Sequence, residues 1–283
     1  MKSLMIQGTA SGVGKSILSI GICRILKRKG WSVAPFKSQN MSSNAYRLES
    51  GLEMAKAQAI AAWACGIEPH VDMNPILLKP AGGIAEVIIQ GRSIGRMNGN
   101  DYETYKKHNA WIPIMDSYHR LTEHYNMIIL EGAGSPVEMN MKDDDVSNMN
   151  MARRAGAPVI IVADIDRGGV FAHVKGTLSL LTDDERASVK GVIINKCRGQ
   201  SERFDDVKNC MEQVIGISVL GMIPYLDIDI EEEDSLGNAQ TGSKTTAADV
   251  TKEFLQRQFE TLADELEKCL DWEKIDKIIE EGN

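Results

Sequence analysis

The chain has 283 residues, of which 43% are hydrophobic and 25% charged, an ordinary composition for a globular protein with a sizeable core. A formal net charge of −8, with no run of basic residues, argues against a nucleic-acid-binding protein. No apolar stretch approaches the roughly 20 residues that span a bilayer, and the first strand leads into a Gly-rich turn rather than a cleavage site, so we expect neither a membrane anchor nor a signal peptide.

Short β-branched runs alternate with amphipathic stretches, a pattern typical of a parallel sheet with crossover helices. The predicted strands, in chain order, are residues 4–7, 32–36, 85–90, 127–131, 158–164, 191–196 and 218–223. Near-continuous apolar strands such as 158–164 indicate a sheet that is buried on both faces. We therefore expect an α/β fold with a doubly wound, mainly parallel sheet and a functional site at the carboxyl ends of the strands.

Helices are predicted between these strands. An apolar stripe predicts a first helix that Gly30 ends, and its members are Ile17, Leu18, Ile22, Ile25 and Leu26. The alanine-rich stretch 53–65 predicts a second helix. Residues 91–126 are polar and aromatic and contain Pro113, so they are predicted to form an insertion rather than a simple crossover.

The organisation changes after the last predicted strand. Residues 1–236 are expected to form the main domain, and residues 237–249 have the Gly, Ser, Thr and Ala content of a linker. Residues 250–283 then repeat apolar side chains at helical spacing, which predicts a final amphipathic helix.

The nine residues GTASGVGKS follow the first predicted strand and open the first predicted helix. In that setting loop amides and a helix N-terminus hold phosphate. The usual loop, G-x-x-x-x-G-K-[ST], would place a glycine where this chain has Thr9, so this loop is one residue longer. Lys15 would neutralise phosphate charge and Ser16 would ligate Mg²⁺; the alternative is a Gly-rich turn that binds nothing. The candidate nucleotide-binding residues are Gly8, Thr9, Ala10, Ser11, Gly12, Val13, Gly14, Lys15 and Ser16.

The longer loop, G-T-x-x-x-V-G-K-[ST], resembles that of dethiobiotin synthetase and of the ATP-dependent amidases that build the corrin ring. Further segments resemble the cobyric acid synthase family, in that family's order and over nearly all of residues 4–236. These segments are residues 34–46, 53–62, 72–80, 91–102, 128–136, 159–177, 191–199 and 219–226. The resemblance implies a P-loop NTPase-like fold of the dethiobiotin synthetase type.

The resemblance also implies a reaction. Carboxylate oxygen is a very poor leaving group, so amide formation in water needs activation, which the family achieves by phosphoryl transfer from ATP with Mg²⁺. The implied activity is amidation of the b, d, e and g carboxylates of cobyrinic acid a,c-diamide to give cobyric acid through acyl phosphates.

Roles in the family carry over to particular residues. Lys15 and Lys37 would be the cations at the transferred phosphoryl group, and Ser16, Glu53 and Glu131 the Mg²⁺ ligands. Glu131 ends an apolar strand just before a Gly-Ala-Gly turn, where its carboxylate would be exposed beside the loop. Two further residues follow the last two strands: Asn195 would pair with the adenine edge and Pro224 would line the purine pocket.

Substrate contacts are expected in two segments. The first, residues 37–46, is rich in amide and hydroxyl groups, and its candidate corrinoid contacts are Gln39, Asn40, Ser42 and Tyr46. The second follows the strand 158–164, where Asp164, Asp166 and Arg167 would hold substrate carboxylates and amides or pair with each other as a structural turn. The five histidines show no metal-binding spacing.

A glutamine amidotransferase domain, which normally completes this family, has no counterpart in the chain. None of the five cysteines lies on a G-x-C-x-G elbow, and their scattered positions fit reduced thiols in a cytoplasmic protein. Residues 257–279 resemble the tail that normally follows that domain, which suggests an internal excision. Two nitrogen sources stay open, free ammonia and a separate glutaminase subunit, and so does a homodimer.

Other readings remain. The related carboxylate-activating enzymes are cobyrinate a,c-diamide synthase and dethiobiotin synthetase, and residues 39–42 and 72–80 favour cobyric acid synthase over both. A partitioning-type switch ATPase would carry an additional lysine early in the loop, where this chain has none. A catalytically silent subunit is a third alternative, against which the intact Lys15, Ser16, Lys37 and Glu131 argue.

Overall fold

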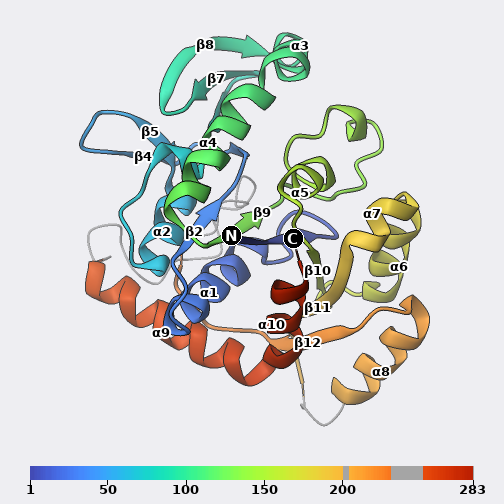
Figure 1. Ribbon diagram of the computed structural model, residues 1–283. Helices are drawn as coiled ribbons and strands as arrows, with labels where there is room; N and C mark the ends of the chain where they lie inside the picture. The colour runs from blue at the N-terminus through green and yellow to red at the C-terminus, as the bar shows by residue number, and fades with distance from the viewer. Residues whose placement is uncertain (200–203, 231–250, 283) are drawn as a thin grey trace.

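A computed structural model describes residues 1–199, 204–230 and 251–282. Its centre is a six-stranded sheet in which every neighbouring pair of strands is parallel (Figure 1). The strand order is β12 (Val219–Pro224), β11 (Val189–Cys197), β10 (Val159–Asp164), β1 (Lys2–Gly8), β9 (Met127–Glu131), β2 (Val33–Phe36). All six strands were predicted, and the doubly wound parallel sheet is confirmed.

Helices cover both faces of this sheet, because alternate strand residues point to opposite sides. In β1, Leu4 and Ile6 join one apolar cluster and Met5 joins the other. The first cluster packs against α1 (Lys15–Arg28), α9 (Lys252–Cys269) and α10 (Trp272–Glu281). The second packs against α4 (Trp111–His124), α5 (Met149–Ala155), α6 (Val170–Leu180) and α8 (Phe204–Ile215). Two more helices are α2 (Lys56–Cys65), which contributes to both clusters, and the short α7 (Asp183–Ser188).

A second, four-stranded sheet was not predicted. Its order is β3 (Gln39–Met41), β6 (Ile76–Ala81), β7 (Ile84–Ile89), β8 (Arg92–Asn98). The predicted strand 85–90 is β7, which pairs antiparallel with β6 and β8 rather than joining the parallel sheet. Gly82 and Gly83, with φ of 59° and 85°, form the turn between β6 and β7, and such a Gly-Gly pair is a hairpin signal.

Two boundaries differ from expectation. The helix predicted over residues 53–65 begins at Lys56, because Glu53–Ala55 is extended as β5 and pairs with β4 (Ala45–Arg47). The insertion 91–126 consists of β8, α3 (Gly99–Asn109) and α4, with two short 3₁₀ turns elsewhere at Val71–Met73 and Lys142–Asp144. Pro113 lies in the first turn of α4, where a missing N–H breaks no helical hydrogen bond.

The predicted C-terminal helix is two helices in the described part of the tail. The break between α9 and α10 falls at Leu270, which pairs with Gly221 beside β12, and Asp271 caps α10 by accepting a hydrogen bond from Lys274 N. The predicted linker, residues 237–249, lies outside the described residues. Of the described helices, none has the length and apolar character needed to cross a membrane.

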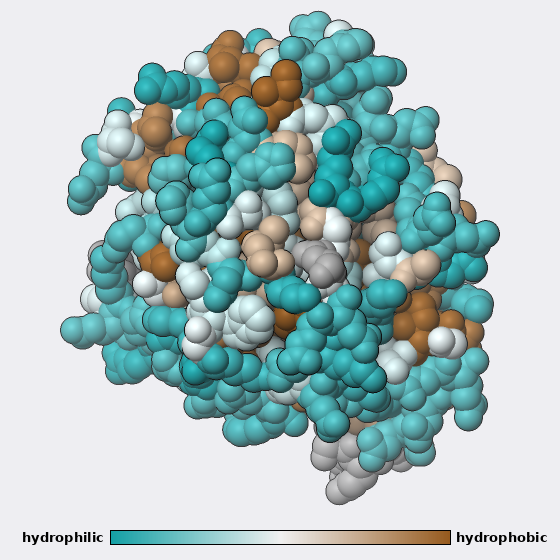
Figure 2. Space-filling view, in the orientation of Figure 1, coloured by the Kyte–Doolittle hydropathy of each residue, from teal (hydrophilic) through white to brown (hydrophobic). Residues whose placement is uncertain are grey.

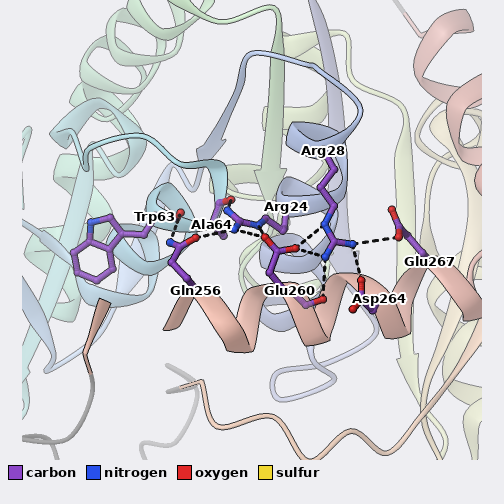
Figure 3. Close-up of polar contacts among 8 residues, drawn as sticks. All are labelled: Arg24, Arg28, Trp63, Ala64, Gln256, Glu260, Asp264 and Glu267. Carbon is purple, nitrogen blue, oxygen red and sulfur yellow. Dashed lines mark hydrogen bonds and ion pairs between the residues drawn. The ribbon is translucent and has the colours of Figure 1, made fainter. Parts of the chain in front are cut away.

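The tail packs on α1, the helix that follows the phosphate-binding loop. Leu262 and Leu266 of α9 are fully buried, and a Cβ on Gly21 of α1 would lie 2.3 Å from Leu266 Cδ1. Polar contacts flank this apolar seam (Figure 3): Arg24 Nη2 donates to Gln256 Oε1 at 2.7 Å, and Arg24 Nε donates to Glu260 Oε1 at 2.8 Å. The main domain and the tail therefore share one core.

The face shown in Figure 2 is mostly hydrophilic. Apolar side chains gather near the top of that view, over the β7–β8 end of the second sheet. Ile84 of β7 and Ile94 of β8 are among the exposed large hydrophobic residues.

Candidate functional site

The candidate site lies where the loop from β1 to α1 meets the carboxyl ends of the neighbouring strands. Thr9 N donates to Val162 O at 2.9 Å, which anchors the start of the loop to β10. The helix α1 begins at Lys15, directly after Gly14, whose φ is 96°. This left-handed conformation is one that glycine adopts at little cost.

At two positions of the loop, neighbouring atoms lie so close to the backbone that only glycine fits. A Cβ on Gly8 would lie 2.6 Å from Val13 Cγ2 and 3.0 Å from Lys15 Cδ. A Cβ on Gly14 would lie 2.2 Å from Asn195 Nδ2. The longer loop is therefore curled tightly on itself and against β11, which explains glycine at both positions.

Lys15 lies between the loop and the turn after β9. Its buried ammonium donates to Ala10 O at 3.0 Å and to Gly134 O at 3.2 Å. Because both of these partners are neutral carbonyls, a phosphate entering the loop would be a stronger partner for the same ammonium.

Ser16, Lys37 and Glu131 meet beside Lys15. Ser16 Oγ donates to Glu131 Oε1 at 2.7 Å, and Lys37 Nζ donates to the same oxygen at 2.9 Å. Glu131 and Lys37 are each about 4% exposed, so this ion pair is shielded from water. Four predicted residues, carried by α1, β9 and the segment after β2, are thus brought together.

These residues fit a magnesium–nucleotide. A serine hydroxyl and a carboxylate are hard oxygen donors, and Mg²⁺ at phosphate sites commonly takes only one or two protein ligands. Thr9 Oγ1 is buried and has no hydrogen-bond partner in the described part of the chain, so this loop hydroxyl is available to a ligand. No cluster of three or more His, Cys, Asp or Glu side chains suited to a metal occurs among the described residues.

Glu53, the third predicted Mg²⁺ ligand, is placed differently. Its carboxylate accepts from Lys79 Nζ at 2.9 Å, and Lys79 also lies 3.5 Å from Glu86. Among the described residues, Glu53 thus pairs with Lys79 on β6 of the second sheet, and not with Ser16 or Glu131. A metal role for Glu53 stays a prediction.

The ends of β10 and β11 hold the far side of the loop. Asn195 Nδ2 donates to Val13 O at 2.9 Å, and Lys196 Nζ donates to Gly12 O at 2.6 Å. The buried Asp164 carboxylate lies 3.4 Å from Lys196 Nζ and 3.8 Å from Arg167 Nε. Pairing of Asn195 with adenine stays a prediction, and its side-chain nitrogen already binds the loop.

The second acidic residue of this turn faces outward. Asp166 accepts two hydrogen bonds from Arg198, at 2.5 and 3.1 Å. Arg167 is 72% exposed by its side chain and lies at the mouth of the loop, with Nη2 3.6 Å from where a Cβ of Gly12 would be. Asp164 and Arg167 thus pair within the turn, as the structural alternative expects, whereas Asp166 pairs with Arg198 outside it. Arg167 is still accessible to a substrate, and a substrate role for these residues stays a prediction.

A cavity of about 620 Å³ opens beside these strand ends. Its lining residues are Ile165, Asp166, Cys197, Arg198, Gly199, Phe204, Val207 and Met222. Arg198 stacks over Tyr225 at 4.0 Å. Pro224 is the strand neighbour of Cys197 but is not among these lining residues, so its contact with the purine stays a prediction. A lining that combines apolar side chains with an aspartate and an arginine suits a purine base.

Of the predicted corrinoid contacts, Gln39 and Asn40 lie on β3, Ser42 follows it and Tyr46 lies on β4. Gln39 Oε1 accepts from the Tyr102 hydroxyl at 2.5 Å, Ser42 accepts from a backbone N–H two residues on, and Tyr46 packs edge-on against an aromatic ring of α2. Asn40 is buried, and its Nδ2 has no hydrogen-bond partner among the described residues. Contact with a substrate stays a prediction for all four.

Two residues beside the turn that follows β9, Gln7 and Asn148, were not predicted from the sequence. Asn148 Nδ2 donates to Ala133 O at 2.8 Å, and a Cβ on Gly132 would lie 2.3 Å from Asn148 Oδ1 and 3.2 Å from Gln7 Cγ. Both side chains are buried, and they support the turn that carries Gly134. Asn148 follows a polar run at 140–147, and no pattern there distinguishes it from a surface residue.

Comparison with known proteins identifies the family of the chain. Residues 4–236 match the model for the CobQ/CobB/MinD/ParA nucleotide binding domain. A protein named "Cobyric acid synthase" from Nostoc punctiforme is 50% identical over 249 residues, which cover 88% of this chain and 50% of that protein. Another of that name, from Lachnoclostridium phytofermentans, is 50% identical over 241 residues, covering 83% of this chain and 47% of that protein. The chain therefore spans about half the length of the curated relatives it matches.

Among solved structures, the signal recognition particle receptor FtsY from Elizabethkingia anophelis aligns with 91% of this chain and 65% of its own at 15% identity. The TM-score is 0.45, below the level at which a common fold can be argued.

Proposed function

Because the chain belongs to the CobQ/CobB/MinD/ParA nucleotide-binding domain family, we propose that it is the synthetase part of a cobyric acid synthase. It would use ATP and Mg²⁺ to amidate the b, d, e and g carboxylates of cobyrinic acid a,c-diamide. The observation that carries the proposal is that Ser16 and Lys37 both bind Glu131 beside the phosphate-binding loop, while the adjacent Lys15 reaches the turn after Glu131 at Gly134 O.

The proposal gives each of these residues a role that its contacts support. Lys15 and Lys37 supply positive charge on two sides of the γ-phosphoryl group, where negative charge is spread during transfer. Ser16 and Glu131 would hold Mg²⁺, which when bound would neutralise phosphate charge. Glu131 also fixes the Lys37 ammonium through the 2.9 Å ion pair, so that the cation is in place before the substrate arrives.

The reaction has two steps. A substrate carboxylate oxygen attacks the γ-phosphorus, an acyl phosphate forms and ADP leaves. Ammonia then attacks the acyl carbon, phosphate leaves and a proton is lost to give the amide. The protein's part is mainly to position the reactants and neutralise charge, because the chemistry needs no covalent enzyme intermediate.

The corrinoid would bind where the segment after β2 meets the mouth of the loop. Arg167 is exposed there and suits a substrate carboxylate, because a guanidinium binds carboxylates through two parallel hydrogen bonds. The buried Asn40 amide suits a carboxylate or carboxamide of the corrin periphery. The purine base would occupy the cavity at the ends of β11 and β12.

Ammonia would reach the site from outside this chain, either free or from a separate glutaminase. A glutaminase cysteine must be a reactive thiolate, and three of the five cysteines here are buried. Burial raises the pKa of Cys23 well above its usual value and raises the pKa of Cys197 to about 12. Neither thiol is suited to attack glutamine at neutral pH.

The test is turnover with purified protein, ATP, Mg²⁺ and cobyrinic acid a,c-diamide, with ammonium or glutamine as nitrogen donor. We expect corrinoid-dependent ADP release with ammonium and none with glutamine. Lys15→Ala should abolish turnover, while Lys190→Ala, at an exposed lysine, should not. Turnover of cobyrinic acid instead would favour the related diamide synthase, and no corrinoid-dependent turnover, even with a glutaminase present, would refute the proposal.

A further inference from the structure

Two side chains from the end of β11 hold successive carbonyls of the phosphate-binding loop. Lys196 Nζ donates to Gly12 O at 2.6 Å, and the neighbouring Asn195 Nδ2 donates to Val13 O at 2.9 Å. Asn195 is buried, so its bond to the loop is shielded from competing water. Both donors therefore act on the two peptide groups just before Gly14.

The direction of these carbonyls determines the direction of the next amides. In a trans peptide the C=O of one residue and the N–H of the next point to opposite sides, and the described residues contain no cis peptide bond. Holding the Gly12 and Val13 carbonyls toward β11 therefore turns the Val13 and Gly14 N–H groups away from β11. Successive N–H groups that point to one side form the concave cradle that binds phosphate.

The backbone of Lys196 has an uncommon conformation at this point. Its φ is 60°, and Gln90 is the other non-glycine residue of the described chain with a positive φ. A strained conformation persists where the surrounding structure over-determines it, and such residues cluster at functional sites. The buried Asp164 lies 3.4 Å from Lys196 Nζ and orients the ammonium toward Gly12.

We propose that Asn195 and Lys196 are positioning residues that pre-organise the loop amides for phosphate, with Asp164 orienting Lys196. This inference rests on the nucleotide-binding part of the proposed function. It assigns Asn195 to the phosphate end of the nucleotide, in contrast to base recognition, and it gives Lys196 a role that sequence reasoning had not found.

The two roles of Asn195 are separated by three probes. We would measure binding of ATP, of inosine triphosphate (which replaces the 6-amino group of adenine by an oxo group) and of inorganic tripolyphosphate, each with Mg²⁺, by calorimetry. The variants are Lys196→Met and Asn195→Leu, which remove the donors and keep most of the side-chain volume. Lys190→Met, at an exposed lysine on the same strand, is the matched control.

If the loop carbonyls are held as proposed, each variant should weaken all three probes by a similar factor of about tenfold, the loss of roughly one hydrogen bond. The ratio of ATP to inosine triphosphate affinity should not change. Weakening of ATP alone, with tripolyphosphate unaffected, would assign Asn195 to the base and overturn the inference, as would unchanged binding by Lys196→Met. Lys196 is partly exposed, so its variant tests the idea even if Asn195→Leu fails to fold. Wild-type protein that binds no ATP would instead refute the proposed function.

Discussion

The close approach of Gly21 and Leu266 predicts that the effect of Gly21→Ala on stability depends on residue 266. The substitution should destabilise the wild-type protein and stabilise the Leu266→Ala variant. Gly21→Ala would normally stabilise a helix interior by about 1 kcal/mol. Here the new Cβ would lie 2.3 Å from Leu266 Cδ1 and 3.0 Å from Leu262 Cγ. Overpacking of this kind costs about 1–3 kcal/mol, so in the wild-type background we expect a net loss of about 1 kcal/mol.

Leu266→Ala removes the obstructing side chain. Leu266 is fully buried in the apolar cluster between α1 and α9, and such a truncation costs about 3 kcal/mol, within the usual 2–5 range. In that background the 2.3 Å contact is gone, and Leu262, whose Cγ would lie 3.0 Å from the new methyl, can shift into the vacated space. The methyl then keeps its helical advantage and should restore about 1 kcal/mol. The coupling between the two sites is then about 2 kcal/mol, as expected for residues in contact.

The assay is urea unfolding of the wild type, both single variants and the double variant, followed by circular dichroism, with changes read from the midpoint at constant slope. Gly30→Ala offers a contrast outside the seam, because a Cβ there meets nothing within 4 Å. Its φ of 88° predicts a loss from backbone strain that Leu266→Ala does not alter. Equal effects of Gly21→Ala in both backgrounds would refute the packing of the tail on α1.

Three further outcomes are expected. Gly14→Ala should abolish ATP binding with the fold retained, because its Cβ would lie 2.2 Å from Asn195 Nδ2 at a φ of 96°; calorimetry showing normal binding would contradict the loop geometry. Glu131→Gln should weaken Mg²⁺ binding in the ATP complex by about 10- to 100-fold, and an unchanged magnesium titration would exclude it as a ligand. Hydrogen bonds from His70 and Arg120 outweigh burial and hold the pKa of Asp72 well below its usual value, so the charged Asp72 stabilises the fold above an unfolded-state pKa of about 3.9 and less as the pH falls. Asp72→Asn should therefore cost about 2 kcal/mol at pH 7 and less at pH 3.5 in urea unfolding, because the unfolded chain then begins to take up the proton; equal losses at the two pH values would contradict the low pKa of Asp72.

The parts of the fold that sequence predicted depend on local patterns. Six buried strands and the loop-to-helix transition at Lys15 follow from apolar runs and a motif that do not need distant partners to be recognised. The second sheet was missed because β3 is only three residues long and gains its identity by pairing with β6, which lies beyond α2 in the chain. The break at Leu270 depends in the same way on Gly221.

The residues of the candidate site also fall into two groups: those that local patterns reveal and those that depend on distant contacts. Lys15 and Ser16 belong to one motif, and Lys37 and Glu131 end buried strands, so their meeting could be expected from parallel topology. The role of Lys196 depends on a positive φ and on a loop carbonyl far away in the sequence, neither of which leaves a pattern in the residues around it. Asn148 was missed because its contact with Ala133 O depends on how the chain folds back after β9.

The packing of the tail on α1 determines when the fold can be completed as the chain is synthesised. Arg24 and Glu260 are 236 positions apart, and ribosomes add roughly 5–20 residues per second, so α1 would emerge on the order of 10 to 50 s before its covering helices. Through that interval the helix that begins at the phosphate-binding loop exposes apolar surface, a state that chaperones recognise. Nascent chains that end before α9 are therefore expected to be held by chaperones, and release should coincide with the emergence of α10.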